Sequence, residues 1–318
     1  MIKGIRFIPR GTTIPFVRVR KMAFVLSAAL ILGSLAAVLG IGLNFGIDFR
    51  GGILIEVRTV EPANVAELRT TLSALSLGEI SLQRFGDDQE VLIRVQRQEG
   101  AEAEQVKAIE VVKQALGDGV EYRRTEFVGP TVGQELIEAG ILAVGLALLS
   151  ILIYVWFRFE WQFGVGAIVA LSHDIISTLG LFALIQHEFN LATVAAVLTI
   201  AGYSINDTVV VYDRVRENLR RYKKMPLAEL FELSINETLS RTTMTSVTTL
   251  LALVAIYVFG GPVLADFALA MIWGIVIGTY SSIFIAVPLL LYTGLRRGDG
   301  NDVDESLVPE YERVEPGS

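Results

Sequence analysis

The sequence predicts an α-helical polytopic membrane protein with six transmembrane helices and one α+β domain outside the bilayer. Three observations lead to this prediction. The 318 residues are 52% hydrophobic and only 19% charged, a composition too apolar for an ordinary soluble domain. Six apolar runs each approach the ~20 residues that cross a bilayer. One long charged segment, residues 44–133, separates the first run from the other five.

The first predicted span covers residues 22–43, carries no charge and follows a basic segment. It is too long for the apolar core of a cleavable signal peptide, so we expect a signal anchor. The other five spans are expected within residues 134–293, at Ala139–Phe157, Phe163–Ile185, Leu191–Tyr212, Thr242–Phe259 and Phe267–Leu291.

Lysine and arginine predict which connections face the cytoplasm. Residues 1–21 hold six basic groups and no acid, and residues 213–240 carry a second basic cluster between spans four and five. The connections at Gln186–Asn190 and Gly260–Asp266 contain neither Lys nor Arg. Both termini are therefore expected in the cytoplasm, and residues 44–133 on the outer side of the membrane.

Two cytoplasmic segments have a character of their own. Pro226–Ser240 shows an amphipathic pattern that begins with proline, which predicts a helix within the loop 213–240. Residues 294–318 are acidic and rich in turn-forming residues, so we expect a disordered tail.

The outer segment alternates strand and helix patterns in the order β-α-β-β-α-β, which matches the ferredoxin-like arrangement. It holds fifteen acidic and ten basic residues. This mildly acidic balance argues against nucleic acid or anionic lipid as its partner. The expected elements are Gly52–Thr59, Ala63–Leu75, Ile80–Phe85, Glu90–Gln96, Ala101–Leu116 and Glu121–Val128.

Asp207 is the most unusual residue of the fourth span, because a carboxylate in a membrane helix costs roughly 2.5–3.5 kcal/mol on insertion scales. It lies sixteen residues after Leu191, or ~24 Å into a hydrocarbon core of ~30 Å. One interpretation is an acid near the interface. The other is a pair with Arg241, which lies eighteen residues before Phe259 and so at a matching depth of ~27 Å.

Hydroxyl groups lie near both charges. Thr245, Thr248 and Thr249 share the helix face of Arg241 by their spacing, and Ser204 precedes Asp207 by three residues. Such hydroxyls can join helices to one another, or they can line a hydrated path for protons. Both interpretations remain open from the residues alone.

Asp174 is expected near the middle of the third span, directly after His173. An aspartate at this depth can be a second relay site or a polar group that joins helices. Because Asp174 and Asp207 differ in expected depth by ~9 Å, a pair of carboxyls sharing one proton, as in an aspartyl protease, fits poorly.

The sequence offers few candidate residues for metal binding or enzymatic catalysis. The chain has no cysteine and two histidines, so it offers no thiolate site and no histidine pair at metal-ligand spacing. Neither H-E-x-x-H nor G-x-S-x-G occurs. We therefore expect no metal, no cofactor and no enzyme activity. A passive channel is also disfavoured, because a charge pair would block a pore unless it moves.

Five motifs follow one another along the chain. They are Gly46-Ile47-Asp48-Phe49-Arg50-Gly51-Gly52, Val128-Gly129-Pro130-Thr131-Val132-Gly133, Leu171-Ser172-His173-Asp174, the block from Gly202-Tyr203-Ser204-Ile205-Asn206-Asp207 to Asn218, and Ser240-Arg241-Thr242. These motifs resemble those of the SecD/SecF family of protein-export subunits, and the fourth-span block is similar to the SecF signature. The resemblance covers nearly the whole chain in order.

The resemblance implies a six-span half of a transporter of the resistance-nodulation-division superfamily in the bacterial cytoplasmic membrane. Its implied partners are SecD, the SecYEG translocon, a YajC-type accessory subunit and the unfolded exported polypeptide. Export would use a proton or sodium gradient. A non-conducting scaffold for SecD and the translocon is the alternative, whereas independent small-molecule efflux would need twelve spans and two outer domains.

The family also implies roles for single residues. Asp207 and Arg241 would couple ion movement to export. Relay or support would come from Asp174, Ser204, Asn206, Thr245 and Thr248, and the outer domain would move on Gly51, Gly52, Gly129 and Pro130.

Overall fold

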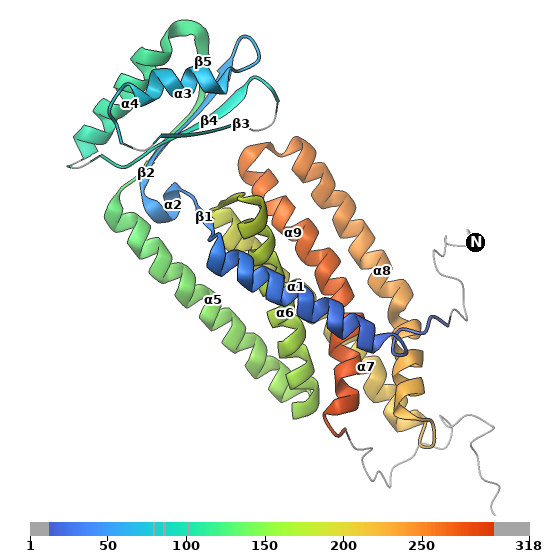
Figure 1. Cartoon of the computed structure of the whole chain (residues 1–318). Coiled ribbons are helices and arrows are strands. Elements are labelled where there is room, and N and C mark those ends of the chain that lie inside the picture. The colour runs from blue at the N-terminus through green and yellow to red at the C-terminus, as the bar shows by residue number, and fades with distance from the viewer. Residues whose placement is uncertain (1–12, 79, 85–86, 99, 101, 296–318) are drawn as a thin grey trace, which may run out of the picture.

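The computed structural model describes residues 13–295 except 79, 85–86, 99 and 101. A helical bundle forms one part of the molecule, and a small α/β unit, here called the sheet domain, stands at one end of it (Figure 1). The bundle contains six helices long and apolar enough to cross a membrane. The expected disordered tail and the basic residues before position 13 lie almost wholly outside the described residues.

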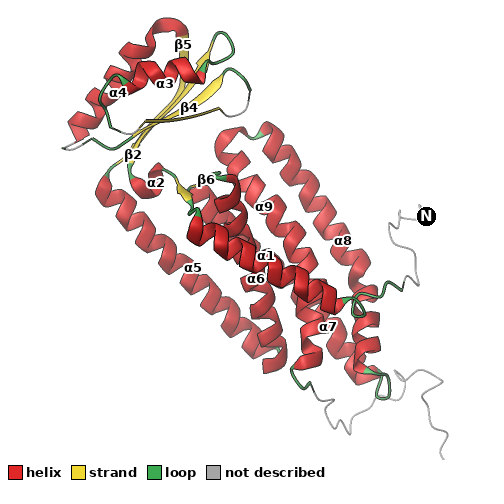
Figure 2. Ribbon diagram, in the orientation of Figure 1, coloured by secondary structure: helices red, strands yellow, loops and turns green. Residues whose placement is uncertain are grey.

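The six spans appear in the predicted order, with the sheet domain between the first and the second (Figure 2). The sixth span changes geometry near its end, where α9 passes into a π-helical turn and then into two short helical pieces. The spans are α1 (Arg20–Gly40), α5 (Pro130–Arg158), α6 (Trp161–Ile185), α7 (Leu191–Arg221), α8 (Leu227–Phe259) and α9 (Gly261–Ser281), the last continued by η2 (Ser282–Ala286), α10 (Val287–Leu289) and η3 (Leu290–Tyr292).

The helix predicted at Pro226–Ser240 is present, but its expected end at Ser240 is wrong. The predicted amphipathic helix at Pro226–Ser240 is not separate from span five, because α8 runs unbroken from Leu227 to Phe259. Neither proline nor glycine interrupts these 33 residues, so nothing in the backbone ends the helix where the polar pattern gives way to the apolar one. The expected loop 213–240 thus shrinks to the non-helical residues 222–226.

Helices α6, α7 and α9 form the interior of the bundle, and α5 lies along its outside (Figure 1). Almost none of the apolar side chains of α5 is buried, Val155 being an exception, whereas half of the apolar stretch of α6 is buried. Close approach between α1 and α6 depends on Gly180, since a Cβ there would overlap Ser34. The exposed apolar side chains of α5 are those expected of a helix that faces lipid.

The sheet domain has the predicted β-α-β-β-α-β order and is a four-stranded antiparallel sheet with the strand order β3-β4-β2-β5. Its two helices cover one face (Figure 2). Its apolar core includes the fully buried Ile53, Ile55 and Ile93. The elements are β2 (Gly52–Thr59), α3 (Val65–Ser73), β3 (Ile80–Arg84), β4 (Glu90–Val95), α4 (Glu102–Leu116) and β5 (Val120–Val128).

A short junction joins the sheet domain to the bundle. After α1, the chain forms β1 (Asn44–Phe45) and the single turn α2 (Ile47–Arg50) before it enters the sheet. β1 pairs in parallel with β6 (Glu188–Phe189), the two-residue strand between α6 and α7. The junction therefore brings the entrance of the sheet domain against the start of α7.

Candidate functional site

Asp207 lies in the middle of the unbroken helix α7 and is 4% exposed. Its Oδ2 atom is buried and has no hydrogen-bond partner among the described residues. A buried carboxylate without partners is costly while it is charged. Asp207 is thus enclosed by the chain itself, and its depth relative to the membrane interface stays a prediction.

The side chains that face Asp207 from α8 differ from the predicted set. Thr242 lies beside the Asp207 carboxyl, and the charge of Arg241 acts on it from farther away. No ion pair within 4.0 Å joins Asp207 to Arg241 among the described side chains. Neighbouring residues on a helix point about 100° apart, so the buried Thr242 occupies the inward position and Arg241 is exposed.

The threonines predicted to share the face of Arg241 also point away from the bundle interior, because they lie on the same side of α8. Thr245 and Thr248 are exposed and donate hydrogen bonds to backbone carbonyls of their own helix. Besides Thr242, the inward hydroxyl of this part of α8 is that of Ser246, which bonds Thr279 of α9 at 2.7 Å. These threonines therefore do not line a path to Asp207 inside this chain.

Asp174 is fully buried in α6 and is the centre of a second polar cluster. Ser204 donates to its Oδ2 at 2.5 Å and Ser281 at 2.8 Å. The Nδ1 atom of His173 lies 3.0 Å from its Oδ1. The carboxyl is thus held by three side chains from α6, α7 and α9, which is the arrangement expected of a group that joins helices.

Two sequence-based assignments change with this cluster. Ser204, expected beside Asp207, bonds Asp174 instead, and Asn206 is exposed. Ser281 was missed, because a small hydroxyl residue within an apolar span carries no sequence signal of its own. Gly278 was missed too. Its place in the cluster is visible only in the structure, where a Cβ at this position would come within 3.5 Å of the Asp174 carboxyl.

The predicted hinge lies where the sheet domain meets the junction. Gly51 and Gly52 have φ angles of 71° and 127°, which L side chains rarely adopt. A Cβ on Gly52 would also approach the backbone oxygen of Val95 to 2.8 Å. Gly129 and Pro130 mark the exit, since α5 begins at Pro130. Gly51 and Gly52 are therefore required by the backbone, whether or not the domain moves.

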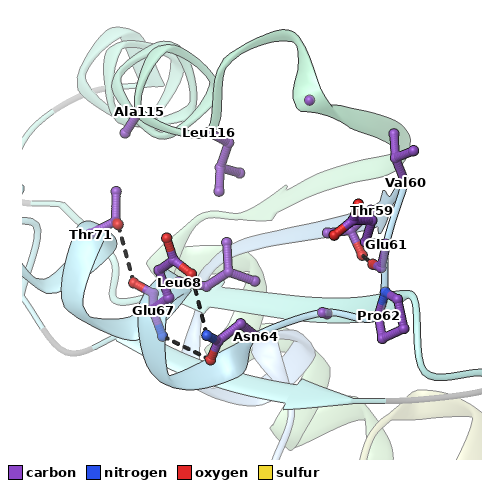
Figure 3. Close-up of a pocket in the computed structure, with 12 residues that line it drawn as sticks. Thr59, Val60, Glu61, Pro62, Asn64, Glu67, Leu68, Thr71, Ala115 and Leu116 are labelled. Carbon is purple, nitrogen blue, oxygen red and sulfur yellow. Dashed lines mark hydrogen bonds between the residues drawn. The ribbon is translucent and has the colours of Figure 1, made fainter.

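A surface hollow of about 440 Å³ lies on the sheet domain, away from the buried aspartates. Asn64, Glu67 and Thr71 form its polar side and are joined by hydrogen bonds, while Leu68 and Leu116 are apolar (Figure 3). Glu61 and Glu67 are the charged residues that line it, and no described histidine, lysine or arginine does. Among the described residues, no group of three or more His, Cys, Asp or Glu could hold a metal ion.

Comparison with known families agrees with this architecture. The C-terminal model of the protein export membrane protein SecD/SecF family matches residues 108–296, and the SecD/SecF GG motif matches residues 36–63. Protein translocase subunit SecF of Rickettsia rickettsii is 46% identical over 298 residues, which are 91% of this chain and 94% of the relative. The SecF subunit of Cereibacter sphaeroides is also 46% identical, over 92% of this chain and 94% of its own.

Two solved structures share the fold. The crystal structure of SecDF, a translocon-associated membrane protein from Thermus thermophilus, superposes with a TM-score of 0.81 at 37% identity, over 89% of this chain. SecDF in a super-membrane-facing form superposes with a TM-score of 0.63 at 37% identity, over 91%. The chain spans only 39% of the length of each of these SecDF chains. The matches together show that this multi-pass membrane protein belongs to the SecF family of protein translocase subunits.

Proposed function

We propose that the chain is an accessory subunit of the Sec translocase that works with SecD and uses the proton or sodium gradient to drive late steps of protein export. In this proposal Asp207 gains and loses the ion, and Arg241 supplies the opposing charge. The observation that supports it best is the contrast between two buried carboxyls. Asp174 has three side-chain partners, whereas Asp207 keeps an oxygen atom without one.

That contrast matters because a proton changes the energy of the two groups differently. A carboxylate held by several donors is stabilised in its charged form. An enclosed carboxylate with an unpartnered oxygen is costly while it is charged, so neutralising it is favourable. Loading Asp207 would also cancel its attraction to Arg241, and so change how α7 packs against α8.

The available energy is sufficient for a domain movement. One elementary charge that crosses 100 mV releases roughly 2.3 kcal/mol. A bias of this size shifts a two-state equilibrium by tens of fold. The sheet domain, attached through Gly51 and Gly52 and through Gly129 and Pro130, would be the moving part.

The remaining predicted residues divide into two groups. Asp174 and Ser204 would serve as the fixed point that joins α6 to α7 while Asp207 changes its charge. Asn206, Thr245 and Thr248 lie on exposed faces, where they can meet the second half of the transporter. These three residues would then take part in an ion relay only in the complex with SecD.

The basic residues support the placement in the bacterial cytoplasmic membrane with both termini inside. Arg158 and the cluster from Arg214 to Lys224 lie at the end of the bundle opposite the sheet domain, as the positive-inside rule requires if that domain is periplasmic. The sheet domain would then meet the unfolded polypeptide as it leaves SecYEG. A YajC-type subunit completes the expected assembly.

Proton uptake into vesicles that hold the chain together with SecD tests this proposal. We expect Asp207→Asn to abolish gradient-driven export and proton uptake, and to leave recovery of the complex unchanged. Asp213→Asn is the matched control, because Asp213 is an exposed acid of the same helix that pairs with Arg158. Normal uptake by Asp207→Asn would reject the relay.

The competing scaffold function gives a different pattern. A subunit that only stabilises SecD and the translocon would lose complex recovery with Asp207→Asn, in parallel with export. Recovery of intact complex without export therefore favours ion coupling over the scaffold.

A further inference from the structure

The sheet domain reaches the bundle through two neighbouring strands. The chain enters it through β2 and leaves it through β5, and these two strands pair with each other. A body attached along one line can swing about that line, so a further contact away from the line is needed to fix its angle. A contact of this kind joins the bundle to β4, the strand on the other side of β2.

Arg94 of β4 makes this contact. Its Nη2 atom hydrogen-bonds and ion-pairs with Oε2 of Glu188 in β6. The two side chains are 14% and 12% exposed, so the pair is largely shielded from solvent. It joins residues 94 positions apart and links the sheet to the connection between α6 and α7.

Glu188 is positioned by the junction rather than by the sheet. β6 pairs with β1, and Gly46 N donates to the backbone oxygen of Phe189 at 2.9 Å. A Cβ on Gly46 would collide with the Glu188 carboxyl. The carboxyl therefore lies where it does because position 46 has no side chain.

The start of α7 belongs to the same junction. Asp48 of α2 accepts a hydrogen bond from Leu191 N at 2.9 Å, and Asn190 accepts one from Thr193 N at 3.0 Å. Asn190 also donates to Asp266, which lies 2.6 Å from Nε2 of His187. The angle of the sheet domain is thus set at the first residues of the helix that carries Asp207.

The charges around the pair favour a contact that can be broken. Burial raises the pKa of the Glu188 carboxyl, Arg94 lowers it, and the nearby Asp266 and Asp48 raise it further. The Nε atom of Arg94 is buried without a partner among the described residues, so the guanidinium makes one contact instead of the stronger two-pronged one. Such a pair fixes a geometry at little net gain in free energy.

We propose that Arg94 and Glu188 form a releasable latch that holds the sheet domain at one angle on the start of α7. When the latch opens, the domain swings about the β2 and β5 connections. This inference rests on the junction alone and does not depend on the ion relay proposed above. Two SecDF structures of equal identity to this chain superpose on it with TM-scores of 0.81 and 0.63, a difference in shape to which no cause is assigned.

The natural absence of cysteine makes a direct test possible. Spin labels on Lys107→Cys in α4 and Leu264→Cys in α9, both exposed positions, report the distance from the sheet domain to the bundle in the full chain in lipid nanodiscs. We expect one narrow distance distribution in this background. Arg94→Gln and Glu188→Gln should each broaden it or move its maximum.

Two further variants separate the latch from general damage. Gly46→Ala displaces the Glu188 carboxyl without removing either charge, and its φ of −69° suits alanine. It should broaden the distribution as the charge variants do. Exchange of the two charges, Arg94→Glu with Glu188→Arg, should narrow it again.

Arg123→Gln is the control, since it breaks the pair with Glu90 inside the sheet domain and should leave the distribution unchanged. Unchanged distributions in the Arg94, Glu188 and Gly46 variants would overturn the latch. So would a control that broadens equally, or an exchange that fails to restore the narrow distribution. If Arg94→Gln does not fold, Gly46→Ala decides the question in the same way.

Discussion

Ser204 on α7 donates a hydrogen bond of 2.5 Å to Oδ2 of Asp174 on α6, within the interior of the bundle. Both side chains are almost completely buried. The bond fixes the rotation of α7 about its own axis relative to α6. Asp207 lies three residues after Ser204 and therefore close to the same helix face, so the fixed contact also determines where the free carboxyl points.

Removing the Ser204 hydroxyl should destabilise the bundle. Ser204→Ala leaves a buried carboxyl short of one donor, which costs about 1–3 kcal/mol in soluble proteins and ~0.6 kcal/mol on average in membrane helices. We expect a loss of about 1 kcal/mol, measured by reversible unfolding in bicelles. Thr199→Ala is the control, because Thr199 is exposed and bonds only its own helix. Equal losses from the two variants would contradict the prediction.

Arg241 should act through its charge and not through the shape of its guanidinium. It makes no ion pair with Asp207 within 4.0 Å among the described residues, and its charge acts from a distance. Arg241→Lys should keep ion-driven export within about tenfold, a loss below ~1.4 kcal/mol in barrier height. Arg241→Gln should abolish it. Export assays in vesicles that hold SecD decide this, and a lysine variant as inactive as the glutamine variant would refute it.

Packing between α1 and α6 should depend on Gly180. A Cβ at this position would overlap Ser34 of α1, so Gly180→Ala forces the helices apart at a cost of about 1–3 kcal/mol. Gly140→Ala on α5 is the matched control, with no atom within 4 Å of the added Cβ. It should be neutral or stabilising by up to ~1 kcal/mol, because alanine favours the helix. Thermal unfolding of both variants in the same detergent tests the difference.

Glu56 should destabilise the sheet domain at neutral pH. It is 7% exposed on β2, and burial raises its pKa above the ordinary 4.5 while Arg124 opposes the shift. A carboxyl whose pKa is higher in the folded state binds its proton more tightly there. The charged form therefore weakens folding, and this cost grows as pH rises from 4.5 through the raised pKa.

Glu56→Gln should thus increase protection of the β2 amides from hydrogen exchange at pH 7. The ratio of variant to wild-type protection, taken at each pH, should fall toward one below pH 4.5, where the wild-type side chain is also neutral. A ratio that stays constant with pH would show that ionisation of Glu56 is not the cause.

The sheet domain could be predicted almost completely from the sequence. Its strands are short, mostly apolar and separated by turns, so local patterns decide them, and β2 has the predicted bounds Gly52–Thr59. The six spans were equally clear, because length and hydropathy are local properties. Span five was an exception, since a polar pattern does not end a helix that has no glycine or proline.

The candidate site could be predicted only in part. The sequence showed that Asp174 and Asp207 lie inside membrane helices, but it did not show what each one touches. The rotation of a helix about its axis depends on its neighbours, and a rotation of one residue moves Arg241 outward and Thr242 inward. Ser204 was therefore assigned to the wrong aspartate. The contact between Arg94 and Glu188 depends on the tertiary fold and left no local signal.

The length of α8 has a mechanical consequence. Its 33 residues make a rod of ~50 Å, against a hydrocarbon layer of ~30 Å. Together with α7, to which it is connected by a short turn, it projects beyond the bundle at the end opposite the sheet domain (Figure 1). A small tilt of α8 inside the membrane displaces its projecting end by a larger distance. If Asp207 carries the proposed ion coupling, a change in how α8 packs against α7 would therefore be largest at the end of the bundle opposite the sheet domain.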